Sequence, residues 1–238
     1  MKISHIFISA VFICSTIHAF AADLSYDPEW GIGILMPSKV GVYDLAPGMI
    51  LPENGFRIYE LPSGRKYAEL LISDNTAIID DEATRREIAD ADKIMIGPET
   101  FCLKIYETTA NYVKVLVSTR KGGYWIANKD ITATNFKNAP WITVLLMIKQ
   151  GLYVTVDEGL NLRNAPSATA TKIVTMKTET FILKLTGKTK ENWAEAEVVE
   201  MDKNPCDGDA KEVNHYTGWV KIIDDKGFPN VWYPVVGC

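Results

Sequence analysis

The sequence predicts an all-β protein made of two small, related barrels. The hexapeptide ETFCLK at 99–104 returns as ETFILK at 179–184, so a segment of the chain is repeated. Around both copies, apolar residues alternate with polar ones in short runs, which is the period of strands with one buried face. The 238-residue chain also contains 16 Gly and 11 Pro, which punctuate such strands as turn residues.

Three further blocks recur in the same order around this hexapeptide. GFRIYELPS at 55–63 matches GLNLRNAPS at 159–167, where an alternating strand is followed by a Pro-Ser turn. The later matches are NYVKV at 111–115 with NWAEA at 192–196, and GYWI at 123–126 with TGWV at 217–220. Collinear blocks of strand and turn indicate an internal duplication. Each copy has so few strands that its sheet must close or nearly close to hide its edges, which predicts two barrels.

The spacing between the copies predicts an insertion in each unit. The first copy carries extra residues at 74–97 and the second at 202–214, and insertions of this size belong in surface loops between strands. Asp residues on either side of EATRRE suit the start of a helix, so we expect a short surface helix at 80–92.

The junction between the units is expected in the polar, Pro-terminated segment TNFKNAP at 134–140. It divides the mature chain into a divergent N-terminal unit at 22–137 and a C-terminal unit at 138–238. The following apolar run, WITVLLMIK at 141–149, is expected to be a strand covered on both faces. It would be either the first strand of the second unit or a strand packed between the two units.

Residues 1–21 have the pattern of a cleavable signal peptide. Lys2 precedes an uncharged, largely apolar run at 6–17, and Ala19-Phe20-Ala21 supplies the small-x-small cleavage pattern. A helix of that run would rise about 18 Å, which is too short for a bilayer core of about 30 Å. We therefore expect a bacterial protein that is periplasmic or secreted, without stable membrane insertion once the signal is removed.

The charge of the chain argues against nucleic acid as a partner. The net charge is −5 at pH 7, and the cations are scattered along the sequence. Affinity for a polyphosphate comes from clustered Lys and Arg, which this sequence lacks.

The repeated blocks resemble the bacterial SH3-like (SH3b) domain. The resemblance is carried by GLNLRNAPS at 159–167, IVTMKTETFILKL at 173–185, NWAEAEV at 192–198 and the closing GWV at 218–220. The first copy is divergent, because Arg57 and Tyr59 stand where the family has Asn and Arg. The resemblance implies a tandem pair of SH3-like barrels in an exported protein. Such domains often target proteins to peptidoglycan or other envelope polymers, or mediate protein contacts, and they are not enzymes themselves.

The mature chain offers few groups for catalysis. Its single histidine is His215, and the sequence contains no Gly-x-Ser-x-Gly elbow, no HExxH and no Cys/His set with zinc spacing. The oxygen-rich segment DKNPCDGD at 202–209 does not have the EF-hand spacing. We therefore expect no enzymatic activity, no bound metal and no cofactor.

Three cysteines remain after signal removal. Cys206 and Cys238 are expected to pair in an oxidising compartment, because this disulfide would attach the second insertion to the C-terminus. Pairings that use Cys102 stay open as alternatives. Cys102 lies between Phe101 and Leu103 in a predicted strand, where a packed apolar role is favoured.

Aromatic residues are the candidate ligand contacts: Tyr112, Trp193, Tyr216, Trp232 and Tyr233. The first two recur at one repeat position, which in the resembling family often borders the ligand groove. The other three occur only in the second unit, where neighbouring Gly and Pro suggest exposure. Rings with one polar edge suit sugars and peptides. The recurring Trp125 and Trp219 are expected to be structural.

Two functions follow from these observations. The first is a non-catalytic envelope protein whose tandem barrels bind a cell-wall polymer or its stem peptide, with avidity from two weak sites. The alternative is a periplasmic protein-interaction module, such as an inhibitor, sensor or assembly factor, that uses the two insertions to recognise one partner.

Overall fold

A computed structural model describes residues 30–38, 55–73, 76–81, 83–97, 100–134, 136–149, 151–178, 180–205 and 209–233. The predicted all-β class is confirmed, because most of these residues lie in strands. The helices in the described ranges are α1 (Asn128–Ala133), α2 (Trp141–Met147) and a 3-10 turn, η1 (Asp90–Asp92). None of them is long and apolar enough to cross a membrane.

Two sheets form the first half of the molecule, which we call the first unit. A four-stranded sheet has the order β11 (Phe136–Pro140), β1 (Gly33–Pro37), β7 (Thr100–Ile105) and β6 (Lys93–Gly97). A seven-stranded sheet has the order β5 (Arg85–Glu87), β4 (Thr76–Asp80), β3 (Lys66–Ser73), β2 (Phe56–Tyr59), β10 (Tyr124–Ala127), β9 (Tyr112–Val115) and β8 (Glu107–Thr108).

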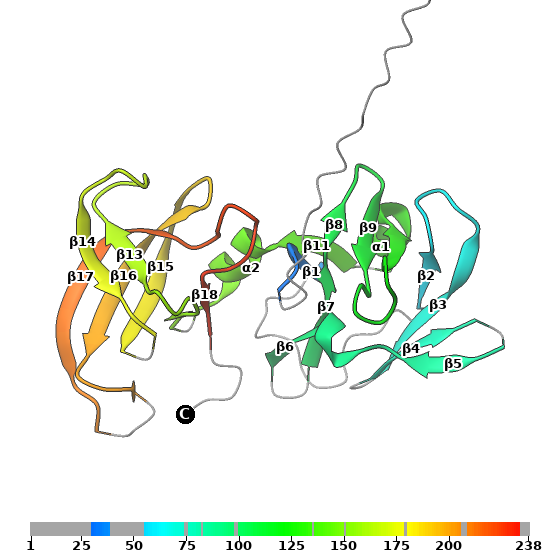
Figure 1. Cartoon of the computed structure of the whole chain (residues 1–238), viewed down its shortest axis with the longest axis horizontal. Helices are drawn as coiled ribbons and strands as arrows, with labels where there is room; N and C mark the ends of the chain where they lie inside the picture. Colours follow the sequence, from blue (N-terminus) through cyan, green and yellow to red (C-terminus); the bar gives the residue numbers. More distant parts are fainter. Residues whose placement is uncertain are drawn as a thin grey trace, which may run out of the picture.

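The second unit also contains two sheets. One pairs β12 (Tyr153–Val154) with β18 (Val231–Trp232). The other has the order β14 (Lys172–Met176), β13 (Leu160–Arg163), β17 (Glu212–Lys221), β16 (Trp193–Met201) and β15 (Phe181–Lys190). In Figure 1, β2–β5 lie toward one end of the long axis and β13, β14 and β17 toward the other, with α2 and β18 between them.

The duplication seen in the sequence is also present in the strand pairing. Gly55 and Gly159 both have positive φ, at 65° and 84°, and each directly precedes the first strand of its copy. A Cβ at either position would lie 2.6 or 2.7 Å from a carbonyl oxygen of the partner strand, so both positions require glycine. The β2–β3 and β13–β14 hairpins then have a bulge at the same point, after Ile58 and after Leu162.

The sheets nevertheless remain open in the part of the chain that the structure describes, and closed barrels are not found. The seven-stranded sheet instead bends strongly. Three strands separate β5 from β10, yet Arg86 of β5 donates a hydrogen bond from Nη2 to the Tyr124 hydroxyl of β10. A side-chain hydrogen bond, rather than backbone pairing, therefore connects β5 with β10 across the bent sheet.

The predicted helix at 80–92 is wrong. This segment contains the end of β4, a tight turn, β5 and the 3-10 turn η1. The Asp81 carboxylate accepts hydrogen bonds from the backbone N–H groups of Ala83 and Thr84, at 3.1 and 2.7 Å, which closes a turn between two strands. Short-range side-chain bonding of this kind competes with helix formation, so Asp80 and Asp81 do not start a helix.

The first insertion belongs to the fold. Asp92 is fully buried, and its Oδ1 accepts hydrogen bonds from the Tyr106 hydroxyl and the Ser118 backbone N–H, at 3.1 and 3.0 Å. Its Oδ2 accepts from the backbone N–H and the hydroxyl of Thr119, at 2.7 and 2.6 Å. Burial, together with the Asp92 charge, raises the pKa of Tyr106, so this phenol remains a donor. Because the carboxylate is saturated by donors, it anchors the insertion to the loop that leads into β10.

The expected strand at 141–149 is also wrong, since Trp141–Met147 forms α2. Pro140 stands at the N-cap, and Trp141, Val144 and Leu145 are buried on one face of the helix. An uninterrupted apolar run does not distinguish a buried helix from a buried strand. The expected junction at 134–140 contains strand β11, which pairs with β1 over its whole length.

Three indole rings hold the two units together. Trp141 of α2 makes edge-to-face contacts with Trp30 and Trp232, at centroid distances of 6.0 and 5.3 Å, and the latter two rings are 5.5 Å apart. Trp141 Nε1 also donates a 2.9 Å hydrogen bond to the Gly31 carbonyl before β1. One apolar cluster accordingly contains Ile34 of the first unit and Val231 of the second.

We predict that Trp141→Ala destabilises the whole chain by about 3–5 kcal/mol, because it removes a buried ring and leaves the Gly31 carbonyl without its donor. Guanidinium unfolding followed by far-UV circular dichroism measures the effect. The control is Leu61→Ala, at a side chain that is 68% exposed, which should change stability by less than about 0.5 kcal/mol. An unchanged midpoint for Trp141→Ala would show that the indole cluster does not join the units.

Candidate functional site

The five aromatic residues predicted as ligand contacts do not form one site. Trp232 and Tyr233 are 9% and 3% exposed, and their rings pack against each other at 4.8 Å within the core. Trp193 is also a core residue, at 9% exposure. The expectation that the C-terminal aromatics are exposed is therefore wrong. The rings of Trp232 and Tyr233 belong to the apolar cluster that spans both units, and their sequence position alone did not reveal this.

The remaining two predicted contacts are half-buried and lie in different units. Tyr112 on β9 makes an edge-to-face contact with Tyr59, at a centroid distance of 6.1 Å. The Tyr216 hydroxyl on β17 donates a 2.8 Å hydrogen bond to Glu200 of β16. The Tyr216 hydroxyl thus supports the long β16–β17 ribbon.

The cysteine predictions are tested only in part. Cys102 is unpaired and 3% exposed, as expected for a packed residue, and burial raises the pKa of its thiol. Cys206 and Cys238, the expected disulfide, lie outside the described residues, as does the signal segment at 1–21. The described ranges contain no candidate metal site, because no three His, Cys, Asp or Glu side chains come close enough together to hold a metal ion.

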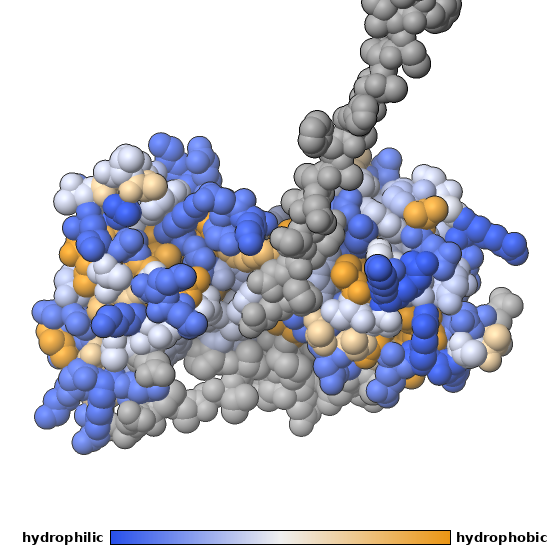
Figure 2. Space-filling model, in the orientation of Figure 1, coloured by the Kyte–Doolittle hydropathy of each residue, from blue (hydrophilic) through white to orange (hydrophobic). Residues whose placement is uncertain are grey.

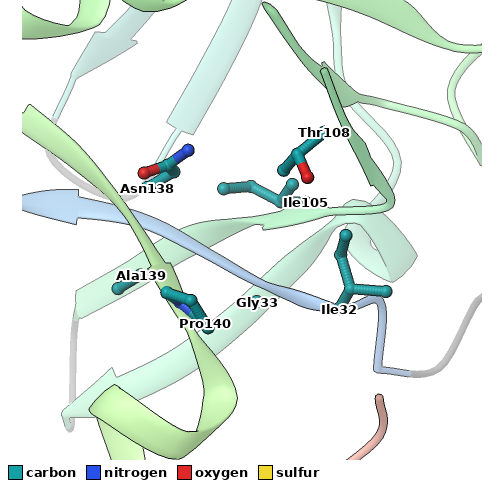
Figure 3. A pocket seen from close by; sticks show the side chains of 7 residues that line it. All are labelled: Ile32, Gly33, Ile105, Thr108, Asn138, Ala139 and Pro140. Atoms are coloured by element: carbon teal, nitrogen blue, oxygen red, sulfur yellow. The ribbon is translucent and has the colours of Figure 1, made fainter. Parts of the chain in front are cut away.

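One cavity of about 260 Å³ lies where the two sheets of the first unit separate. Figure 3 shows its lining, which comes from β1, the residue before it, β7, β8 and β11: Ile32, Gly33, Ile105, Thr108, Asn138, Ala139 and Pro140. A Cβ at Gly33 would lie 2.5 Å from the Ala139 carbonyl oxygen, so the β11 backbone approaches closely here, and Thr108 and Asn138 supply the polar groups of the lining. The lining contains no charged group, so this cavity suits a small uncharged group and offers little selectivity.

A row of side chains on the outer face of the second unit has a different character. Arg163 of β13 stands directly opposite Lys172 of β14 on one side and Trp219 of β17 on the other. Trp219 is in turn opposite Glu195 of β16. Residues directly opposite each other share one face of a sheet. We call Lys172, Arg163, Trp219 and Glu195 the cross-strand row.

Two cations of this row face each other without compensation. Neither Arg163 nor Lys172 forms an ion pair with any residue in the described ranges, while Glu195 is paired with Lys188 at 2.9 Å. Arg163 is held in place, because its Nη1 donates a 2.6 Å hydrogen bond to the Ala170 carbonyl. Like charges directly opposite each other destabilise a sheet. An anion placed between them would relieve that repulsion, next to the half-buried Trp219 ring.

The first unit contains the equivalent row in a saturated form. Its members, by the same strand pairing, are Lys66, Tyr59, Trp125 and Lys114. Lys66 is paired with Glu69 at 2.7 Å, and Lys114 with Glu107 at 2.5 Å. Lys114 Nζ lies 4.7 Å from the centroid of the Trp125 ring, which is 6% exposed. The lysines of the row thus have carboxylate partners in the first unit, whereas Arg163 and Lys172 of the second unit have none among the described residues.

Figure 2 shows that the visible face of the second unit carries small apolar patches between hydrophilic side chains rather than one broad apolar surface. Such a surface suits a polar ligand with limited apolar contact better than a large apolar one. The sequence pattern did not indicate a role for Arg163, which lies in the repeated block at 159–167, or for Lys172, which directly precedes the segment at 173–185. Their opposition depends on the bulge that skips Ile173, and no sequence pattern reports that bulge.

Comparison of the chain with protein-family models, with curated proteins and with solved structures finds no match. The function of the cross-strand row is therefore inferred from its own geometry and charge.

We predict that Lys172→Glu stabilises the protein by about 0.2–1 kcal/mol at low salt, because it replaces a like-charge pair by an opposite-charge pair. The gain should shrink at high salt, since the Lys172 side of the pair is exposed. Urea unfolding at two salt concentrations measures it. The matched Lys66→Glu change should give no gain, because Lys66 already pairs with Glu69. If both changes have the same effect, the Arg163–Lys172 repulsion is absent.

A second prediction concerns the β16–β17 ribbon. Hydrogen bonds from Asn214 and Tyr216 hold the pKa of Glu200 below its usual value. Because this pKa is depressed, the stabilisation is present above the unfolded-state pKa of Glu200 and is lost as pH falls through the folded-state pKa. Tyr216→Phe should therefore raise the Glu200 pKa, as measured by NMR titration, whereas Tyr112→Phe in the other unit should leave it unchanged. A Glu200 pKa that does not respond to Tyr216→Phe would contradict this assignment.

Proposed function

We propose that this protein is a non-catalytic binding protein of the bacterial envelope, built from tandem SH3-like units. Its second unit binds a carboxylate-bearing stem peptide of the cell wall at the cross-strand row. The observation that carries the proposal is the uncompensated Arg163–Lys172 pair beside the half-buried Trp219. The signal-peptide pattern at 1–21 and the resemblance of the repeated blocks to the SH3b family support the envelope as the location.

The chemistry of the row matches such a ligand. A guanidinium and an ammonium side by side bind carboxylate groups by charge-assisted hydrogen bonds. The adjacent indole face offers apolar contact to an aliphatic segment of the same ligand. Glycan rings, in contrast, prefer exposed aromatic platforms, and three of the five aromatic residues expected to form one are buried. The charge and the burial both favour the peptide part of the wall over its sugars.

We predict that the full mature chain co-sediments with purified peptidoglycan and that Arg163→Gln weakens this binding by about tenfold or more. One charge-assisted hydrogen bond contributes about 1.5–3 kcal/mol, and 1.4 kcal/mol is a factor of ten in Kd. The matched control is Arg57→Gln, an exposed cation on β2 of the first unit, which should bind like wild type.

A second arm compares wall material whose stem-peptide carboxylates are free with material in which they are amidated. The proposal requires stronger binding to the free carboxylates and weaker binding as salt is raised. Absence of co-sedimentation, or equal binding by wild type and Arg163→Gln, would overturn it.

A further inference from the structure

The two units differ at one sheet edge. In the first unit, β3 is an interior strand, because β4 pairs with it from Glu69 to Ser73. In the second unit, the equivalent strand β14 is the edge of the five-stranded sheet and, among the described residues, pairs with β13 alone. The strand that covers β3 is supplied by the first insertion, which has no counterpart after β14.

The equivalence of β3 and β14 rests on their bulges. In both hairpins the bulge skips one residue that follows a lysine, Tyr67 after Lys66 and Ile173 after Lys172. These skipped residues are 37% and 41% exposed, which makes them two of the few large apolar side chains exposed in the described ranges. Tyr67 stacks on Tyr124 at 5.2 Å, and Ile173 reaches the space above Gly218. The same apolar surface position is thus kept in both units while the residue type changes.

The strand that covers β3 shows which chemistry suits this edge. β4 has the sequence TAIID and is followed by Asp81. Its Ile79 is fully buried opposite Leu70 of β3. Its acidic end, Asp80 and Asp81, lines a cavity of about 360 Å³ together with Arg65, Lys66, Tyr67 and Ala68 of the β3 end. Asp80 itself is opposite Glu69 and is ion-paired with Arg85 of β5. An apolar strand with an acidic end is therefore already bound, within this molecule, at the first-unit edge.

The β14 edge has the complementary properties for such a strand. Its sequence KIVTM is rich in β-branched residues and contains no proline, so its outer backbone groups form an open pairing edge. Lys172 and Arg163 place two uncompensated cations at its basic end. We propose that β14 binds, by strand addition, an extended segment of a partner protein that has an apolar centre and an acidic end.

This inference goes beyond the proposed wall binding and does not depend on it. Strand addition uses the backbone of β14 and the side chain of Ile173, whereas the cross-strand row uses side chains on the outer face. The two share only the Arg163–Lys172 charges. Slower hydrogen–deuterium exchange of the β14 backbone amides therefore distinguishes strand addition from a ligand that binds through side chains alone.

The test uses the full mature chain and a synthetic peptide with the β4-derived sequence TAIIDD, from positions 76–81. We expect binding by isothermal titration calorimetry, and slower hydrogen–deuterium exchange of the backbone amides in 172–176. Two control peptides carry the matched changes: TAIIKK reverses the charge, and N-methylation of alternate residues in TAIIDD blocks backbone pairing while the side chains remain. Both should bind at least tenfold more weakly.

Variants of the protein test the same charge and apolar contacts from the β14 side. Lys172→Glu should weaken TAIIDD by about tenfold and strengthen TAIIKK, because the complementarity is inverted. Ile173→Ser should weaken both peptides, while Val213→Ser, at another exposed apolar residue of the same sheet, should weaken neither. Protection that appears in β3 or β15 instead of β14 would overturn the proposal. So would N-methylated TAIIDD binding as well as TAIIDD, or a concentration-dependent dimer that protects β14 without peptide.

The outcomes also separate this inference from the wall proposal. TAIIDD binding that survives while peptidoglycan co-sedimentation fails overturns only the wall proposal. Co-sedimentation that depends on Arg163, with no exchange protection in β14 by TAIIDD, overturns only strand addition.

Discussion

The arrangement of the molecule depends on the contact among Trp30, Trp141 and Trp232. The three rings come from the segment that precedes β1, from α2 and from β18, so they join parts of the chain that are distant in sequence. The hydrogen bond from Trp141 Nε1 to the Gly31 carbonyl fixes the orientation of the central ring. Edge-to-face indole contacts bury large apolar areas in one geometry, and they hold two sheet systems at a defined spacing. The surfaces at the two ends of the molecule are presented on this rigid centre.

The two units share the same hairpin pairing, so equivalent side chains in the two units can be compared directly. The bulges after Ile58 and Leu162 place a lysine and an apolar residue at equivalent points. In the first unit the lysine has a carboxylate partner and the tryptophan of the row lies under Lys114. In the second unit, Arg163 and Lys172 have no ion-pair partner among the described residues. A duplicated fold can keep one copy saturated for stability and leave the other available for a ligand, and the observed ion pairs fit that division.

The first insertion covers a sheet edge that would otherwise be exposed. It supplies β4 and β5 to one side of β3, and Asp92 anchors its far end through hydrogen bonds to the loop before β10. The insertion is therefore an integral part of the first unit, and substitutions of its exposed residues are better probes of function than its removal. In the described part of the second unit no strand covers β14, which leaves that edge of the sheet open.

The sequence by itself determined the all-β class, the duplication, and the glycine-led strands at 56–59 and 160–163, because these depend on local periodicity and on backbone conformations that glycine permits. It did not decide between helix and strand for the apolar run at 141–147, since both can be buried. Nor did it show that Trp232 and Tyr233 fill the centre or that Arg163 faces Lys172. Burial and cross-strand opposition depend on which distant segments meet and on where a bulge shifts the register. Only the tertiary structure decides these, because they result from packing between residues far apart in the chain.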